Sequence, residues 1–157
     1  MAPWLLADLE RNRDLLARGQ VWRLVTSLVV QDGGAVGAVF NLVFLAVVGF
    51  AAEDVWDRSW VVIALAAGIG GQLWGLLVQP AGAGNSVVNF GLAASLAAMS
   101  VLQGPRVPRV LGLVSLVGAV TLLVLDDIHG GASLIGAVLG LLFGRSRRGP
   151  VPADVVE

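Results

Sequence analysis

Five apolar stretches divide the chain, and short polar or glycine- and proline-containing segments separate them. The stretches are residues 35–52, 60–79, 86–103, 109–125 and 129–144. Each approaches the roughly 20 residues that an α-helix needs to cross about 30 Å of hydrocarbon. A segment in lipid must satisfy its own backbone hydrogen bonds, so each stretch is expected to be a helix. The pattern predicts an all-α, polytopic transmembrane bundle of five spanning helices.

The composition agrees with a membrane protein and excludes several other classes. Of the 157 residues, 57% are hydrophobic and 13% are charged, and the mean hydropathy is +0.85. A soluble domain of this length cannot bury so much apolar surface. A net charge of −1 and the lack of a long basic run argue against a nucleic-acid partner. Cysteine is absent, which excludes disulfides and thiol nucleophiles, and nothing in the sequence predicts a metal or a cofactor.

The flanking segments differ in character from the predicted membrane domain at residues 35–144. Residues 1–34 intersperse leucines with arginines and predict an amphipathic surface segment, not a signal peptide. Residues 145–157 predict a disordered cytoplasmic tail. If the five helices alternate, six arginines fall on one side and predict that this side is cytoplasmic: Arg58, Arg106, Arg109, Arg145, Arg147 and Arg148. Arg11, Arg13, Arg18 and Arg23 fall on the opposite side, against that rule.

Polar residues inside membrane segments are costly and tend to mark function. The candidates are Asn41, Gln72, Ser86, Asn89, His129 and Ser133. Asn41 and Gln72 can each be explained as an interhelical hydrogen-bonding group. Ser86 precedes an apolar run and can be explained as a helix N-cap.

A catalytic interpretation of Ser86 requires a base, oxyanion donors and access to water. His129 is the sole histidine of the chain, and it lies at the same predicted depth as Ser86. Backbone N–H groups at a helix start could supply oxyanion donors. At 100° per residue, His129 and Ser133 share one helix face with Gly136, Gly140 and Gly144. This glycine face predicts contact with another helix, and a Ser–His dyad forms if that helix begins at Ser86.

At this point residues 18–144 resemble the rhomboid family of intramembrane serine proteases. The segment GQVWRLVTSLV (19–29) looks like the family's Trp-Arg loop, and FNLVFLAVVGFAAE (40–53) looks like its second helix, which places Asn41 at the oxyanion position. GNSVVNFGL (84–92) is similar to the nucleophile motif GxSGxxxGL. In that motif Ser86 matches the nucleophile, Phe90 an aromatic position that packs on the histidine, and Gly91 part of the closing pair. DIHGGASLIGAVLG (127–140) looks like the histidine-bearing sixth helix.

The sequence also departs from the family pattern. Val87 follows the serine where the family usually has glycine, and Gly37 stands where a histidine often precedes the oxyanion asparagine by four residues. By the family's spacing from Gly136 and Gly140, the catalytic position is Ser133, and His129 lies one turn, about 5.4 Å, nearer the outer surface. A small shift of the helix would restore the dyad. The family's first helix has no counterpart, so either the lineage has five spans or the given start lies downstream of the true one.

Two functions remain open at this stage, and a third ranks below them. The first is an intramembrane serine endopeptidase in a prokaryotic plasma membrane, which cleaves transmembrane segments. In this function Ser86 and His129 form the dyad, and Asn41 and the Ser86 N–H are the oxyanion donors. The second is an inactive rhomboid-like protein that binds transmembrane clients, with Ser86 as a cap. A transporter or channel ranks last because no acidic residue lies inside a span.

Overall fold

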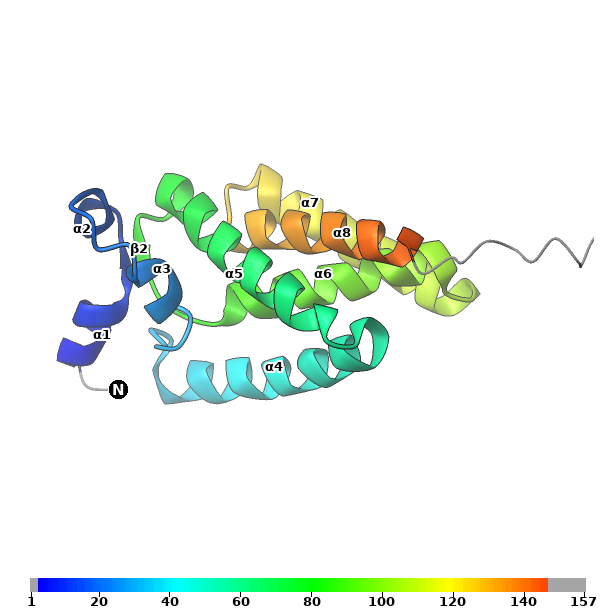
Figure 1. The fold of residues 1–157 in the computed structure, drawn as a ribbon, viewed down its shortest axis with the longest axis horizontal. Coiled ribbons are helices and arrows are strands. Elements are labelled where there is room, and N and C mark those ends of the chain that lie inside the picture. Colours follow the sequence, from blue (N-terminus) through cyan, green and yellow to red (C-terminus); the bar gives the residue numbers. More distant parts are fainter. Residues whose placement is uncertain (1–2, 147–157) are drawn as a thin grey trace, which may run out of the picture.

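The computed structural model describes residues 3–146 and contains five long helices that run back and forth along one axis (Figure 1). These helices are α4 (Gly34–Trp56), α5 (Ser59–Val78), α6 (Ser86–Gln103), α7 (Arg106–Val124) and α8 (Ile128–Ser146). All five are long and apolar enough to cross a membrane. The predicted all-α bundle with five spanning helices is confirmed.

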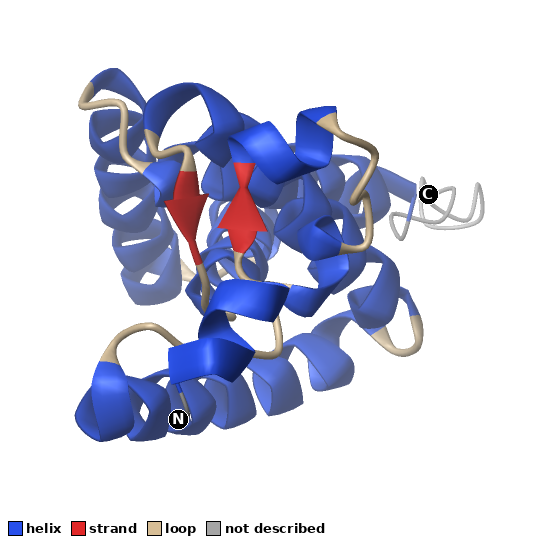
Figure 2. Cartoon of the chain, turned by 90° about the vertical axis from the view of Figure 1, so that its left-hand side faces the viewer, coloured by secondary structure: helices blue, strands red, loops and turns tan. Residues whose placement is uncertain are grey.

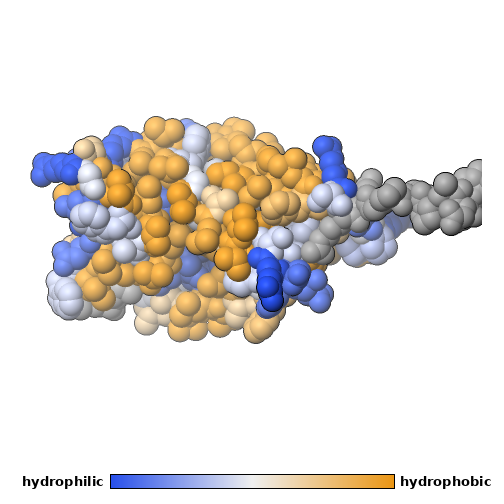
Figure 3. All heavy atoms as spheres, viewed as in Figure 1, coloured by the Kyte–Doolittle hydropathy of each residue, from blue (hydrophilic) through white to orange (hydrophobic). Residues whose placement is uncertain are grey.

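The surface of the molecule shows why it belongs in a bilayer. On the face shown in Figure 3, hydrophobic residues cover most of the middle of the molecule, and hydrophilic residues gather toward its two ends. Exposed valine, leucine and phenylalanine side chains on α4 and α7 contribute to this apolar surface. So much exposed apolar surface is stable against lipid and not against water. The protein is therefore an integral membrane protein.

The region before α4 is folded more closely onto the bundle than the predicted amphipathic segment implies. It contains α1 (Pro3–Leu9), β1 (Arg11–Asn12), α2 (Arg13–Ala17) and α3 (Arg23–Thr26). Strand β1 pairs antiparallel with β2 (Ala81–Gly82), which lies between α5 and α6 (Figure 2).

Two arginines in this region are buried instead of facing water. Arg23 donates to the backbone oxygens of Ala7 and Glu10, at 3.0 and 2.9 Å. Arg11 donates to the side chain of Gln72 and to the backbone oxygen of Gln79. The periodicity of leucines and arginines could not anticipate this, because the acceptors are backbone carbonyls and a residue distant in sequence.

The centre of the bundle is built around α6, which packs most extensively against α8. The glycines of α8 face the α6 backbone. A β carbon at Gly140 would lie 2.5 Å from the carbonyl oxygen of Ser95, and one at Gly136 would collide with the carbonyl group of Gly91. Small residues allow such close approach of membrane helices, where packing replaces the hydrophobic effect.

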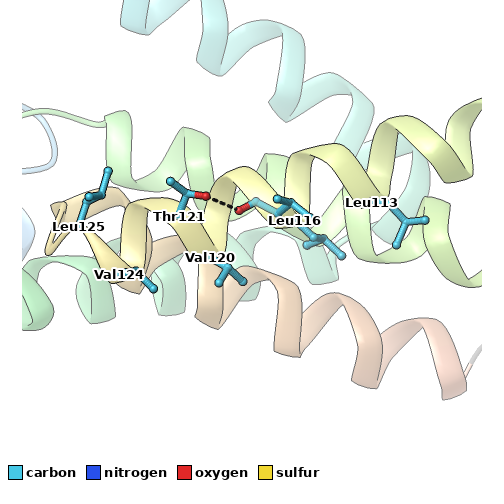
Figure 4. Close-up of a pocket in the computed structure, with 7 residues that line it drawn as sticks. Leu113, Leu116, Val120, Thr121, Val124 and Leu125 are labelled. Carbon is cyan, nitrogen blue, oxygen red and sulfur yellow. Dashed lines mark hydrogen bonds between the residues drawn. The ribbon is translucent and has the colours of Figure 1, made fainter.

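In contrast to this close packing, the outer face of α7 is largely exposed apolar surface. A hollow of about 420 Å³ on this face is lined by α7 residues and by Leu125, which directly follows the helix, all apolar except Thr121 (Figure 4). The Thr121 hydroxyl donates to the backbone oxygen of Val117 within the same helix. This satisfies the hydroxyl without a partner from elsewhere. We interpret the hollow as lipid-facing surface.

Candidate active site

Ser86 is the first residue of α6 and follows a loop that is fixed by glycines and by the N-terminal region. Gly84 has a φ of +144°, which favours glycine. The Gly84 N–H donates to the Ser27 backbone oxygen at 2.8 Å, and the Ala83 N–H donates to Asp32 Oδ2 at 2.9 Å. The N-cap position belongs to Asn85, whose side chain makes no capping bond. Ser86 therefore does not serve as the N-cap of this helix.

His129, near the start of α8, points at Ser86. The distance from His129 Nε2 to Ser86 Oγ is 2.9 Å. Ser133 lies one turn further into the membrane region and is buried. A short α7–α8 turn, in which Asp126 has a φ of +55°, starts α8 at Ile128. The histidine that appears one turn out of register in the sequence is thus the one that contacts Ser86.

Asp127 contacts the other side of the histidine. Its Oδ1 lies 2.6 Å from His129 Nδ1 and also accepts the His129 backbone N–H at 2.8 Å. Sequence reasoning treated Asp127 only as part of a polar loop. An aspartate two residues before a histidine at a helix start was the available signal, because an N-cap carboxylate lies beside the second helical residue.

An aromatic ring packs against the face of the His129 imidazole, and a second ring packs against the first. The rings of Phe90 and His129 are 4.4 Å apart between centroids. Phe44 of α4 meets Phe90 edge-on at 6.4 Å. Aromatic rings at these separations restrict one another's orientation. The ring of His129 is therefore fixed by Phe90 on its face and by Asp127 and Ser86 at its two nitrogens.

Asn41 belongs to an amide network close to Ser86. Its Nδ2 donates to Gln31 Oε1 at 3.0 Å, and Gln31 Nε2 donates to Asn85 Oδ1 at 2.6 Å. The Asn41 backbone oxygen accepts from the buried Asn89 side chain at 2.9 Å. Gln31 and Asn85 were missed by sequence reasoning, since both lie in segments that read as connecting loops.

Gly84 lies where these groups converge. A β carbon on Gly84 would lie 3.3 Å from Gln31 Oε1, 3.7 Å from Ser86 Oγ and 3.8 Å from Asn41 Nδ2. Ser86 and Asn41 therefore face the same small region beside the loop. The Asn41 amide nitrogen has two N–H groups, of which Gln31 accepts one.

A polar cavity of about 120 Å³ adjoins the same side of Ser86. Its lining residues include Arg11, Asp32, Gln72, Ser86 and His129. Burial lowers the pKa of Arg11, and the nearby carboxylates of Asp32 and Glu10 act in the opposite direction.

A larger, mostly apolar pocket of about 490 Å³ lies between α4, α6, α7 and α8. Phe44, Phe90, Gly118 and Ser133 are among the residues that line it. Ser133 thus faces this apolar pocket and makes none of the contacts with Ser86 that are described above.

Residues 3–146 contain no group of three or more histidine, cysteine, aspartate or glutamate side chains that could hold a metal ion.

Comparison with known proteins identifies the family of the chain. The family model described as the Rhomboid domain matches residues 18–148. No curated protein and no solved structure matches the chain. The matched range contains Asn41, Ser86, Asp127 and His129 and covers most of the chain. The chain belongs to the rhomboid family.

Proposed function

We propose that this protein is an intramembrane serine endopeptidase that cleaves transmembrane segments of other membrane proteins. The observation that carries the proposal is the 2.9 Å contact between Ser86 Oγ and His129 Nε2. A hydroxyl within hydrogen-bonding distance of an oriented imidazole is the arrangement that activates a serine nucleophile. Rhomboid-family membership supports the same reaction class.

In the proposed reaction, Ser86 Oγ attacks the scissile carbonyl carbon and its proton passes to His129 Nε2. The oxyanion accepts hydrogen bonds from the second N–H of Asn41 and from the backbone N–H of Ser86, which begins α6 and has no intrahelical acceptor. His129 then protonates the leaving amine, and the carbonyl remains as an ester on Ser86.

Hydrolysis of this ester needs water beside Ser86. The 120 Å³ polar cavity borders both Ser86 and His129. The cavity is polar and large enough to admit water. His129 would remove a proton from a water molecule there, and the attack of that water releases the acid and restores the Ser86 hydroxyl.

The decisive experiment uses the purified full chain in detergent and a fluorophosphonate probe, which labels activated serines. We expect labelling of the wild type, loss in Ser86→Ala and His129→Ala, and retention in Ser133→Ala. The same variants are then tested for cleavage of a transmembrane substrate in liposomes. Absence of labelling and cleavage in folded wild-type protein, with an active rhomboid protease labelled in parallel, would contradict the proposal.

The second candidate is a catalytically inactive protein that binds transmembrane clients. Two observations favour it: Val87 occupies the position after the serine, and an N–H of Asn41 is already donated to Gln31. Under this alternative, Ser86→Ala leaves client binding and client abundance unchanged. Co-purification of a client at wild-type levels by Ser86→Ala, without cleavage by either protein, would support it.

We further propose that the chain lies in a prokaryotic plasma membrane with Arg58, Arg106 and Arg145 on the cytoplasmic side. The orientation follows from the positive-inside rule, since these arginines lie at the end of the bundle opposite β1 and β2. Arg147, Arg148 and most of the predicted tail lie outside the described residues. Because the chain has no cysteine, Arg18→Cys and Arg58→Cys give unique labelling sites. In intact cells, a membrane-impermeant maleimide should label the first and spare the second; the reverse result would invert the orientation.

A further inference from the structure

We propose that Asp127 is a positioning residue that holds the His129 ring toward Ser86, so that the site is a Ser86–His129–Asp127 triad. The proposal deepens the proposed function and rests on it for its catalytic consequence. The contact itself is a property of the fold and can be measured without any activity.

The geometry defines which nitrogen carries the proton. Asp127 Oδ1 lies 2.6 Å from His129 Nδ1, while Nε2 faces Ser86 Oγ. A carboxylate accepts hydrogen bonds, so Nδ1 is the nitrogen that carries the hydrogen. In the neutral ring, Nε2 then has a free lone pair directed at the serine hydroxyl. This is the tautomer that a general base needs, and the opposite tautomer cannot accept the proton.

The backbone of residue 127 is fixed from a third helix. The Trp74 indole Nε1 of α5 donates to the Asp127 backbone oxygen at 3.0 Å. A β carbon at Gly131 of α8 would lie 2.5 Å from the Trp74 ring, so α8 and the indole are in close contact there. The carboxylate is therefore attached to a well-packed part of the bundle although it lies in a turn.

The competing explanation is that Asp127 only caps α8. An N-cap carboxylate accepts the N–H of the second or third helical residue, and Asp127 does so with the His129 N–H. Capping does not require the additional contact with the ring. Asparagine and serine cap helices about as well as aspartate. Replacing Asp127 with either residue therefore preserves the cap while changing what the ring contacts.

The solvent exposure of the Asp127 and His129 side chains determines how large a loss of kcat we expect. The side chain of Asp127 is 40% exposed and that of His129 is 23% exposed. Water screens a partly exposed carboxylate, so its influence is smaller than that of a buried one. For Asp127→Asn and Asp127→Ser we expect kcat to fall about 10- to 100-fold, against the ~10⁴-fold loss when a buried triad aspartate becomes asparagine. KM should stay within about twofold, because the carboxylate lies on the side of the ring away from Ser86.

The kinetic test uses the full chain in liposomes with a transmembrane substrate. Asp126→Asn is the matched control: it removes one negative charge from the adjacent exposed residue, and asparagine tolerates the positive φ found there. A fall in kcat for both Asp127 variants, with Asp126→Asn at the wild-type value, supports the proposal. Wild-type kcat in both Asp127 variants would overturn it and leave Asp127 as a cap. Thermal unfolding in detergent establishes that each variant is folded.

A spectroscopic test separates this proposal from the proposed function. His129 is the sole histidine, so ring ¹⁵N labelling of histidine, with an affinity tag that contains none, gives signals from this residue alone. We expect one protonated nitrogen, Nδ1, in the wild type, and a mixture of tautomers in Asp127→Ser. An identical tautomer in both proteins would overturn the proposal. If the wild type holds the Nδ1–H tautomer through Asp127 but neither labels nor cleaves, the proposed protease function fails and the positioning contact stands.

Discussion

Three helices of this bundle are tightly packed and two are not. In their most apolar 18-residue windows, 39% to 44% of the residues of α5, α6 and α8 are buried, against 11% for α4 and 6% for α7. Glycine contacts contribute to the difference. In α6 and α8, glycines bring backbones into contact, whereas a β carbon added at Gly37 or Gly49 of α4 or at Gly118 of α7 would have no neighbour within 4 Å. Gly112 is the α7 glycine in close contact, because its β carbon would lie 2.6 Å from the Ala97 carbonyl oxygen of α6.

The proposed nucleophile and base lie on two of the closely packed helices. Ser86 and His129 lie at the starts of α6 and α8, the most extensively packed pair, so their 2.9 Å contact is held by backbone-to-backbone packing. Helices α4 and α7 contribute side chains to the 490 Å³ pocket, and most of their remaining surface is exposed apolar side chains. The pair that carries the reactive groups is closely packed, and α4 and α7, which complete the pocket, have far fewer buried residues.

The largest effect should come from enlarging a glycine in the tight pair. In Gly136→Ala, the new β carbon would collide with the Gly91 carbonyl group, so α6 and α8 must separate. Overpacking of this kind costs on the order of 1–3 kcal/mol or more. We expect a clear drop in Tm and loss of fluorophosphonate labelling, because Ser86 and His129 lie on the two helices that move.

Gly118→Ala in α7 is the matched control for this prediction. Its β carbon would have no neighbour within 4 Å, and alanine favours helix over glycine by up to about 1 kcal/mol. Its Tm should equal or slightly exceed that of the wild type. Equal losses of Tm in both variants would show that the distinction between tight and loose helices is wrong.

The sequence predicted the architecture well for a physical reason. Lipid requires each spanning segment to be a continuous apolar helix, so hydrophobic length alone located the five helices. The error was at the ends: α4 continues to Trp56, four residues beyond the predicted end at 52. Trp56 is buried and its indole donates to Ser95 Oγ at 3.0 Å. A contact with a residue 39 positions away decides this boundary, and local composition cannot reveal it.

The site was predictable only in part. The motif around Ser86 and the lone histidine named the two residues whose side chains meet. Gln31, Asn85 and Asp127 were missed, because their importance comes from hydrogen bonds between segments that are distant in sequence or from a turn geometry that periodicity does not encode. His129 lies one turn from the family's spacing. The sequence could not show whether it reaches Ser86, since this depends on where α8 begins.

A smaller effect, confined to catalysis, is expected from Asn41 in the loosely packed α4. Asn41→Ala removes the proposed oxyanion donor, and loss of one such donor costs about 10²–10³ in kcat. The measurement is kcat for cleavage of the transmembrane substrate. Because Asn89 and Asn85 bond to the Asn41 backbone oxygen, which alanine retains, the fold should survive.

Gln31→Ala tests whether Asn41 acts directly. It removes the acceptor of the Asn41 amide and the donor to Asn85 while leaving the Asn41 side chain in place. We expect a smaller loss of kcat than in Asn41→Ala. A loss that is equal or larger would mean that the amide network as a whole, and not the Asn41 N–H, supports the reaction.

The smallest effect is expected from filling the pocket beside α7. Gly118→Leu places a side chain in the 490 Å³ pocket, where the position of a β carbon is unobstructed. If a transmembrane substrate reaches Ser86 through this pocket, KM for cleavage should rise several-fold while Tm stays near the wild-type value.

The small fluorophosphonate probe separates access from chemistry in this variant. Its labelling of Ser86 should remain within about twofold of the wild-type rate, because the Ser86–His129 contact lies on α6 and α8 and uniform binding affects KM without affecting the chemical step. Gly118→Ala is again the control and should cleave normally. Unchanged cleavage by Gly118→Leu would remove the pocket from the substrate's path. Loss of labelling together with cleavage would show instead that α7 supports the catalytic pair, which would contradict the division between tightly and loosely packed helices.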